Sequence, residues 1–111
     1  MGKTLRIDDD GSVPQNNPFM SETTDATRHC VFSYGHRNHQ AMVYDPKCNV
    51  IFSNEHGPDG GDELNIIQAG VNYGWSVITY GNDYIGGRTQ IQRSTLGTNR
   101  GDESCGTSLA I

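Results

Sequence analysis

Two loops of this chain combine side chains whose types and spacing suit chemistry. The first has the sequence GHRNHQ at residues 35–40. Its arginine offers a planar fork of donors that suits carboxylates and quinone oxygens, and its amides add donors and acceptors. The second has the sequence EHGPDGGDELN at residues 55–65. Gly-rich loops expose backbone carbonyls, and calcium is bound by carbonyl and carboxylate oxygens. The two loops therefore indicate a segment rich in donors for anionic or carbonyl oxygens and a segment rich in oxygen ligands.

The elements that must position these loops are short strands. Runs rich in Val, Ile, Phe and Tyr alternate with Gly, Asn, Asp and Ser clusters, which is typical of strands joined by turns. Regular spacing of such runs favours a sandwich, a barrel or a propeller. The sequence predicts a mainly β, antiparallel fold with strands at residues 3–7, 29–34, 40–44, 50–54, 62–67 and 74–80.

The two loops, together with NYGW at residues 72–75, closely resemble the pyrroloquinoline-quinone-dependent soluble glucose and aldose sugar dehydrogenases. Those enzymes are six-bladed β-propellers several times longer than this chain. The resemblance implies that Arg37, Asn38 and Gln40 contact the quinone and that the carbonyls of Gly57 and Pro58 hold calcium. Two positions depart from the family pattern: His39 stands where Pro is usual and Ala41 where Gly is usual.

One propeller blade needs about 40–45 residues, and the four expected strands between residues 40 and 80 fill that length. The sequence therefore predicts one domain over residues 1–111, with a blade-like core at 29–81 and a polar, weakly patterned tail at 82–111. We expect Trp75 in the core of the blade. A single blade exposes both edges, which favours completion by homo-oligomerisation.

Composition limits the partners that this chain is expected to bind. The formal charge is -5 and the eight basic residues are scattered, which argues against nucleic acid and against an anionic membrane surface. The sequence contains no apolar stretch long enough to span a bilayer and no secretory signal. The chain as given therefore has the character of an intracellular protein, although the enzymes it resembles are exported, so its localisation stays open. A sugar or quinone remains the expected small-molecule partner.

Three interpretations of function follow. The first is a segment of a quinoprotein sugar dehydrogenase that uses pyrroloquinoline quinone and calcium. Because no residue matches the general-base histidine of that family, it stays open whether the chain is itself an enzyme. The second is a non-catalytic, self-assembling β-protein that serves as a binding or structural module.

The third interpretation is a metal-binding protein. Its candidate ligands are His29, Cys30, His36, His39, Cys48 and His56. Their spacing matches no zinc motif. The odd, dispersed cysteines suit ordinary thiols, although one disulfide is compatible with the sequence.

Overall fold

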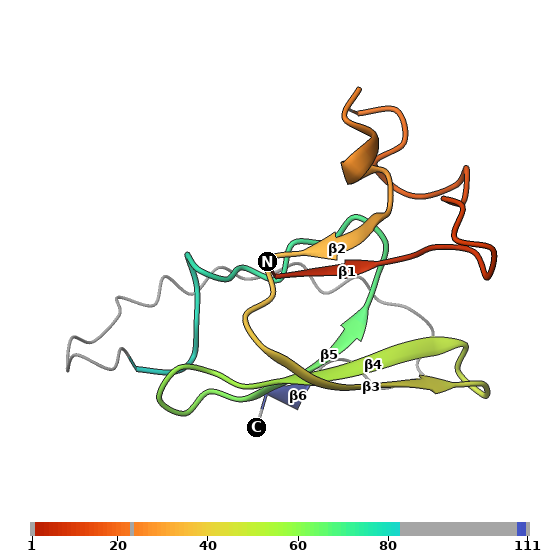
Figure 1. Ribbon diagram of the computed structural model, residues 1–111. Helices are drawn as coiled ribbons and strands as arrows, with labels where there is room; N and C mark the ends of the chain where they lie inside the picture. The colour runs from red at the N-terminus through yellow and green to blue at the C-terminus, as the bar shows by residue number, and fades with distance from the viewer. Residues whose placement is uncertain (1, 23, 83–108, 111) are drawn as a thin grey trace.

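The computed structural model describes residues 2–22, 24–82 and 109–110 and consists mainly of two antiparallel sheets (Figure 1). The smaller sheet pairs two strands, and the larger has the order β3-β4-β5-β6. The elements are β1 (Lys3–Leu5), the 3₁₀ helix η1 (Ala26–Arg28), β2 (Val31–Tyr34), β3 (His39–Asp45), β4 (Val50–Glu55), β5 (Glu63–Ile67) and β6 (Leu109–Ala110). The predicted fold class, mainly β with antiparallel sheets, is confirmed.

A tight hairpin joins β3 and β4. The first predicted loop leads into β3, and the second follows β4. Asn49 has a φ of 53°, a left-handed conformation that asparagine tolerates better than most residues. The Asp45 carboxylate accepts a hydrogen bond from the Lys47 amide at 2.9 Å, closing the turn. From this turn the two strands pair with each other from Asp45–Val50 to His39–Glu55. Both predicted loops therefore lie at the same end of the hairpin.

The register of β3 on β4 shifts between His39 and Ala41, which leaves Gln40 as the extra residue of a β-bulge. A bulge interrupts the alternation of side chains and redirects the ones next to it. The sequence analysis expects an unbroken strand at residues 40–44 and did not predict this irregularity.

The predicted strand at residues 74–80 is wrong, because this segment forms turns. The amides of Val77 and Ile78 both donate to the carbonyl of Gly74, at 2.8 and 2.9 Å, and the Trp75 amide donates to the Gly35 carbonyl. Its backbone groups are therefore used in a turn and in a contact with the first loop. The fourth strand of the large sheet is β6, in the predicted tail, most of which lies outside the described residues.

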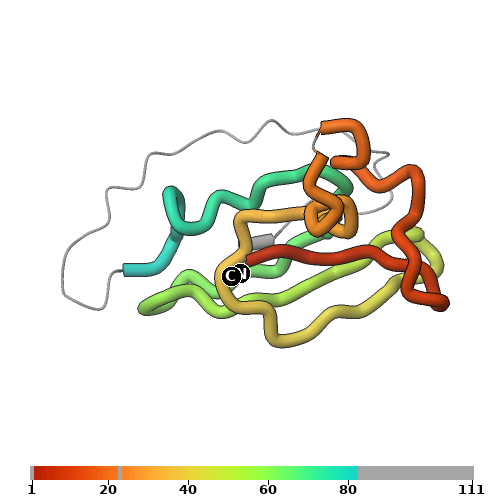
Figure 2. The backbone as a smooth tube through the Cα atoms, turned by 45° about the horizontal axis from the view of Figure 1, so that its top comes forward, coloured from red at the N-terminus to blue at the C-terminus, as the bar shows by residue number. Residues whose placement is uncertain are grey.

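The small sheet and the segment between its strands lie above the large sheet, as the ribbon and tube views agree (Figures 1 and 2). Asn17 is buried and anchors the long connection between β1 and β2, since its Nδ2 donates to the carbonyls of Arg6 and His29, both at 2.9 Å. A loop of polar composition can thus be held in place through its backbone groups.

The interior of the described residues is unusually polar. Val31 and Ile67 are its buried hydrophobic side chains, whereas its buried polar residues are Thr4, Asn17, Ser33, His36, Ser53, Glu55, Asn65 and Thr79. Buried polar groups of this kind must be hydrogen-bonded to avoid a large desolvation cost. Hydrogen bonds, rather than a large apolar core, therefore specify much of this interior.

Three smaller expectations from the sequence are also resolved. Trp75 is 39% exposed, so its predicted place in the core is wrong within this chain. Cys30 is a free thiol, whereas Cys48 is disulfide-bonded, so the cysteines are not all ordinary thiols. In the part of the chain described, there is no helix with the length and apolarity that crossing a membrane requires.

Candidate functional site

The two predicted loops lie against each other at the open end of the β3–β4 hairpin. The His56 amide donates to the Asn38 carbonyl at 3.0 Å, and Arg37 Nη1 donates to the His56 carbonyl at 2.7 Å. His56 is thus bonded to the first loop through both of its backbone groups, one residue before Gly57. The structure therefore brings the predicted quinone-contacting residues next to the predicted calcium-binding turn.

Within the first loop, Arg37, Asn38 and Gln40 form a polar group that reaches the surface. The Arg37 guanidinium lies over the Trp75 ring, 5.3 Å from its centroid. Gln40 Nε2 donates to Asn38 Oδ1 at 2.9 Å, a contact that the bulge at Gln40 makes possible. Asn38 and Gln40 are exposed and Arg37 is half-buried. The group therefore combines a positioned guanidinium with accessible side-chain amides.

The second loop is a compact turn in which the position of Gly57 has no room for a side chain. A Cβ atom at Gly57 would lie 2.0 Å from the Gly60 carbonyl oxygen and 2.5 Å from that of Gly61. Asp62 closes the turn, since its Oδ1 accepts from the Gly57 amide at 3.0 Å and its Oδ2 contacts His56 Nδ1 at 3.1 Å. These hydrogen bonds, the one with the His56 side chain foremost, lower the pKa of Asp62. Asp62 thus caps this loop, and Glu63 begins the next strand, β5.

Behind the two loops lies a buried chain of hydrogen bonds that the sequence analysis did not find. It runs from Thr4 on β1 to Ser33 on β2, and from Ser33 Oγ to His36 Nε2 at 2.8 Å. His36 Nδ1 then donates to Glu55 Oε1 at 3.0 Å, because a carboxylate can only accept. The chain links the small sheet to the large one through the first loop.

Glu55 holds the first loop from below. Its Oε2 accepts hydrogen bonds from the backbone amides of Arg37 at 2.6 Å and Asn38 at 3.3 Å, and its Oε1 also accepts from Asn65 Nδ2 at 2.8 Å. Burial by itself would raise the pKa of Glu55, but the hydrogen bonds from His36 and Arg37 outweigh it and lower the pKa to about 2. Glu55 is therefore an ionised carboxylate that positions the loop.

Glu63 faces Glu55 across the β4–β5 pair and behaves differently. Asn65 Nδ2 donates to Glu63 Oε2 at 3.1 Å, but burial dominates and raises the pKa of Glu63. Tyr73 encloses the site on another side: its ring stacks on His36 with centroids 4.3 Å apart, and its hydroxyl accepts from the Gln68 amide. The Tyr73 ring therefore borders the site, and Glu55 is its ionised carboxylate.

A signal for these buried residues was present in the sequence. Ser53 and Glu55 are two residues apart on β4, so they face the same side of the sheet, and the structure buries both. The polar run that ends β4, with Ser53 and Glu55 on one face, follows three apolar residues and indicates an interior hydrogen-bond network. Partner residues from β2 and β5 could not have been assigned without the sheet register.

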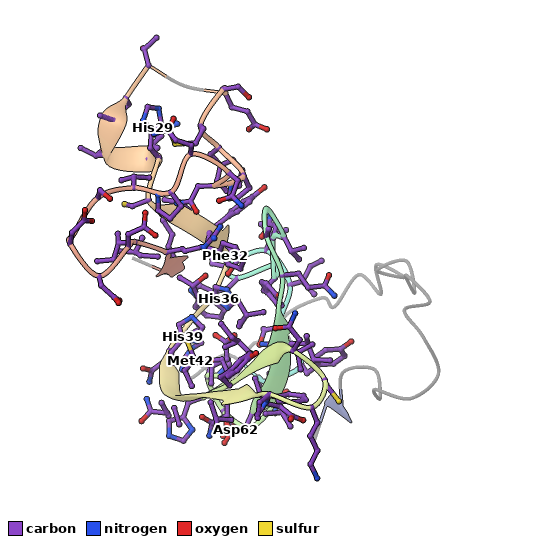
Figure 3. The ribbon with its side chains drawn as sticks, turned by 90° about the vertical axis from the view of Figure 1, so that its right-hand side faces the viewer. His29, Phe32, His36, His39, Met42 and Asp62 are labelled. Atoms are coloured by element: carbon purple, nitrogen blue, oxygen red, sulfur yellow. The ribbon has the colours of Figure 1, made fainter. Side chains whose placement is uncertain are left out.

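The proposed ligands of the third interpretation are not brought together as a set. Figure 3 shows His36 and His39 close together at the junction of the two sheets, whereas His29 lies well away from them in the N-terminal part. The described residues that could share a metal ion are His36, His39 and Glu55, with neither Cys30 nor His56 among them.

Comparison with known proteins decides the ancestry. Residues 1–110 match the sequence profile of the glucose/sorbosone dehydrogenase family. The chain belongs to this family. It is 48% identical over 85 residues to the aldose sugar dehydrogenase YliI of Escherichia coli, a match covering 77% of this chain and 22% of the relative. It is 40% identical over 75 residues to quinoprotein glucose dehydrogenase B of Acinetobacter calcoaceticus, covering 68% of this chain and 15% of that protein.

This chain matches part of the fold of solved structures of the family. The apo form of the soluble aldose sugar dehydrogenase from Escherichia coli superposes with a TM-score of 0.71 at 46% identity, covering 78% of this chain and 24% of that one. The PQQ-bound aldose sugar dehydrogenase from Streptomyces coelicolor gives a TM-score of 0.56 at 44% identity, covering 68% and 20%. The expected likeness to the propeller sugar dehydrogenases is confirmed, and the chain spans about a fifth of the length of the aldose sugar dehydrogenase of Escherichia coli.

Proposed function

We propose that this chain supplies one part of the cofactor site of a quinoprotein aldose sugar dehydrogenase. The observation that carries the proposal is the joining of the two loops through His56, which places Arg37 and Asn38 beside the Gly57–Pro58 turn. Bound pyrroloquinoline quinone would supply the two-electron acceptor that aldose oxidation requires.

The residues present fit such a cofactor. Arg37 provides a planar, permanently charged donor group for carboxylates and quinone oxygens, and Asn38 and Gln40 add amide donors at the surface. Glu55 and His56 fix the backbone and guanidinium of Arg37 beforehand, which lowers the ordering cost of binding. We therefore assign Arg37, Asn38 and Gln40 to binding and orienting the quinone.

The turn after β4 fits calcium. Its close approach of Gly57 to the Gly60 and Gly61 carbonyls crowds backbone oxygens into a small volume, and calcium takes oxygen ligands of this type. We assign the carbonyls of Gly57 and Pro58 to holding the ion, which would act there as a Lewis acid.

Quinone binding to the purified chain tests the proposal directly. Trp75 is the one tryptophan of the sequence and lies next to Arg37, so its fluorescence should be quenched in a saturable way as quinone is added, more strongly with Ca²⁺ present. Arg37→Ala should weaken binding by about 10- to 100-fold, corresponding to one hydrogen bond to a charged group. Because this change also alters the surroundings of Trp75, binding should be measured by equilibrium dialysis as well.

Arg28→Ala is the matched control. Arg28 is exposed in η1, where it pairs with Asp25 away from the two loops, so its removal should leave quinone binding unchanged. Quinone binding that is equally strong in the Arg37→Ala protein would sink the site assignment.

A further inference from the structure

His39 carries a buried nitrogen atom for which the described part of the chain offers no hydrogen-bond partner. Its Nδ1 lies 2.7 Å from Ser53 Oγ, and Ser53 uses its single hydroxyl proton to donate to the Ala41 carbonyl at 3.0 Å. Ser53 must therefore accept from His39 Nδ1–H, which places the lone pair of neutral His39 on Nε2. That Nε2 atom is buried and has no hydrogen-bond partner among the described residues.

His39 belongs to a cluster of metal-ligand side chains. One ligand atom from each of His36, His39 and Glu55 falls within 4.8 Å of the other two, and the His36 and His39 ring centroids are 4.2 Å apart. Two imidazoles and one carboxylate are a ligand set that zinc uses in sites that keep a fourth position open. His36 and Glu55 are 1% and 5% exposed, and His39 is half-buried with its Nε2 atom buried.

We propose that His36, His39 and Glu55 form a binding site for a divalent transition-metal ion, with Zn²⁺ as its occupant. His36 and His39 belong to the first loop, but their side chains and that of Glu55 are not the ones assigned to the quinone, so the two sites can be tested separately. Calcium is disfavoured here, since nitrogen ligands suit zinc and calcium prefers oxygen.

The surroundings are arranged as metal sites usually are. Ser53 fixes the tautomer and orientation of His39, and Asn65 donates to Glu55 from the side away from the loop. Metal binding would require only local rearrangement of the ligand side chains. Tetrahedral zinc, with bonds of about 2.0–2.2 Å, spaces its ligands about 3.4 Å apart, so the side chains must draw together and His36 must release one of its hydrogen bonds.

The state of the ligands before binding favours this exchange. Burial foremost, with the neighbouring His36, lowers the pKa of His39. Glu55 is ionised. The negative charge of the Glu55 carboxylate therefore offsets part of the charge of a divalent ion bound beside it.

Titration of the chelator-treated chain with Zn²⁺, followed by calorimetry, tests the site. One equivalent should bind, and excess Ca²⁺ should not displace it. His39→Gln should weaken the affinity by about tenfold or more, because it removes the free ligand atom. His56→Gln is the matched control, since His56 is exposed and pairs with Asp62 outside the cluster, and it should bind Zn²⁺ as the wild type does.

A measurement on the unaltered chain covers the case in which His39→Gln does not fold. The imidazole proton resonances of His36 and His39 should shift with one equivalent of Zn²⁺, while those of His29 and His56 stay in place. Absence of stoichiometric binding, equal affinity in the His39→Gln protein, or shifts confined to His29 and His56 would each overturn the proposal.

Discussion

Glu55 accepts four hydrogen bonds through its two carboxylate oxygens, from the His36 ring, the Asn65 amide group and the backbone amides of Arg37 and Asn38. Charge-assisted bonds of this kind are the stronger ones in proteins, and the loss of one buried partner leaves its donors unsatisfied. At the scale of single residues, Glu55 is therefore the group on which the geometry of the first loop depends.

Glu55→Gln should destabilise the fold by about 2–4 kcal/mol, because the new NH₂ group cannot accept the hydrogen bonds that one carboxylate oxygen now accepts. Urea denaturation monitored by circular dichroism measures this change. Glu63→Gln is the control: the pKa of Glu63 is raised by burial, so replacing that carboxyl group with an uncharged amide should cost little. Equal losses in the two variants would contradict the role given to Glu55.

The same residue should give the stability of the chain a pH dependence. The pKa of Glu55 is about 2 in the folded state and lies below its ordinary value of 4.5. A carboxyl group whose pKa is lower in the folded state than in the unfolded state stabilises the fold at a pH above its unfolded pKa. This contribution is lost as the pH falls from about 4.5 towards 2. The difference in unfolding free energy between the wild type and Glu55→Gln should therefore shrink over that range, and a constant difference would refute the pH assignment.

At the scale of elements, the turn from Gly57 to Asp62 is defined by close backbone packing. Gly57→Ala should destabilise the chain by about 1–3 kcal/mol, the usual cost of overpacking, because its Cβ would overlap the Gly60 carbonyl. Gly60→Asn is the control, since Gly60 has a φ of 73° with open space around it and asparagine tolerates that conformation. Thermal melts of both variants, with calcium binding measured alongside, check that Gly57→Ala loses more stability than Gly60→Asn.

The β3 strand begins at the end of the first loop and is poorly covered. It lies at the edge of the large sheet, and the consecutive residues Met42, Val43 and Tyr44 are 52%, 62% and 55% exposed. Because side chains alternate between the faces of a strand, exposure of consecutive residues means that neither face of β3 is covered. An exposed apolar edge strand is a template for pairing with another chain.

At the scale of the whole molecule, this exposure predicts that the isolated chain self-associates. Sedimentation velocity should show species larger than the monomer that grow with protein concentration. Val43→Lys places a charge on the edge and should shift the distribution towards monomer, whereas Lys47→Arg, in the neighbouring turn, should not. A wild-type chain that stays monomeric at every concentration tested would remove the support for homo-oligomerisation.

The polar interior is consistent with the low apolar content of the sequence, in which 33% of residues are hydrophobic. A domain of this size buries a modest share of its surface, so an interior organised by Thr4, Ser33, His36 and Glu55 gives a defined structure with limited stability. This explains why single polar substitutions are expected to have large effects here.

Local patterns in the sequence were sufficient to predict several features. The β-branched and aromatic runs of β2 to β5, and the turn residues between them, follow from preferences of neighbouring residues, and so does the cap made by Asp62. The two loop motifs also carried the family resemblance, which the match over residues 1–110 confirmed.

Tertiary structure decided what depends on partners distant in the chain. The turn at residues 74–80, the choice of Leu109–Ala110 as fourth strand, and the bulge at Gln40 depend on which backbone groups find partners elsewhere. The burial of His36 against Glu55, and the lone pair left on His39, likewise require Ser33, Ser53 and Asn65 to meet from separate strands. Sequence periodicity reports the face on which a side chain lies, but hydrogen-bond partners are set by the register of the assembled sheets.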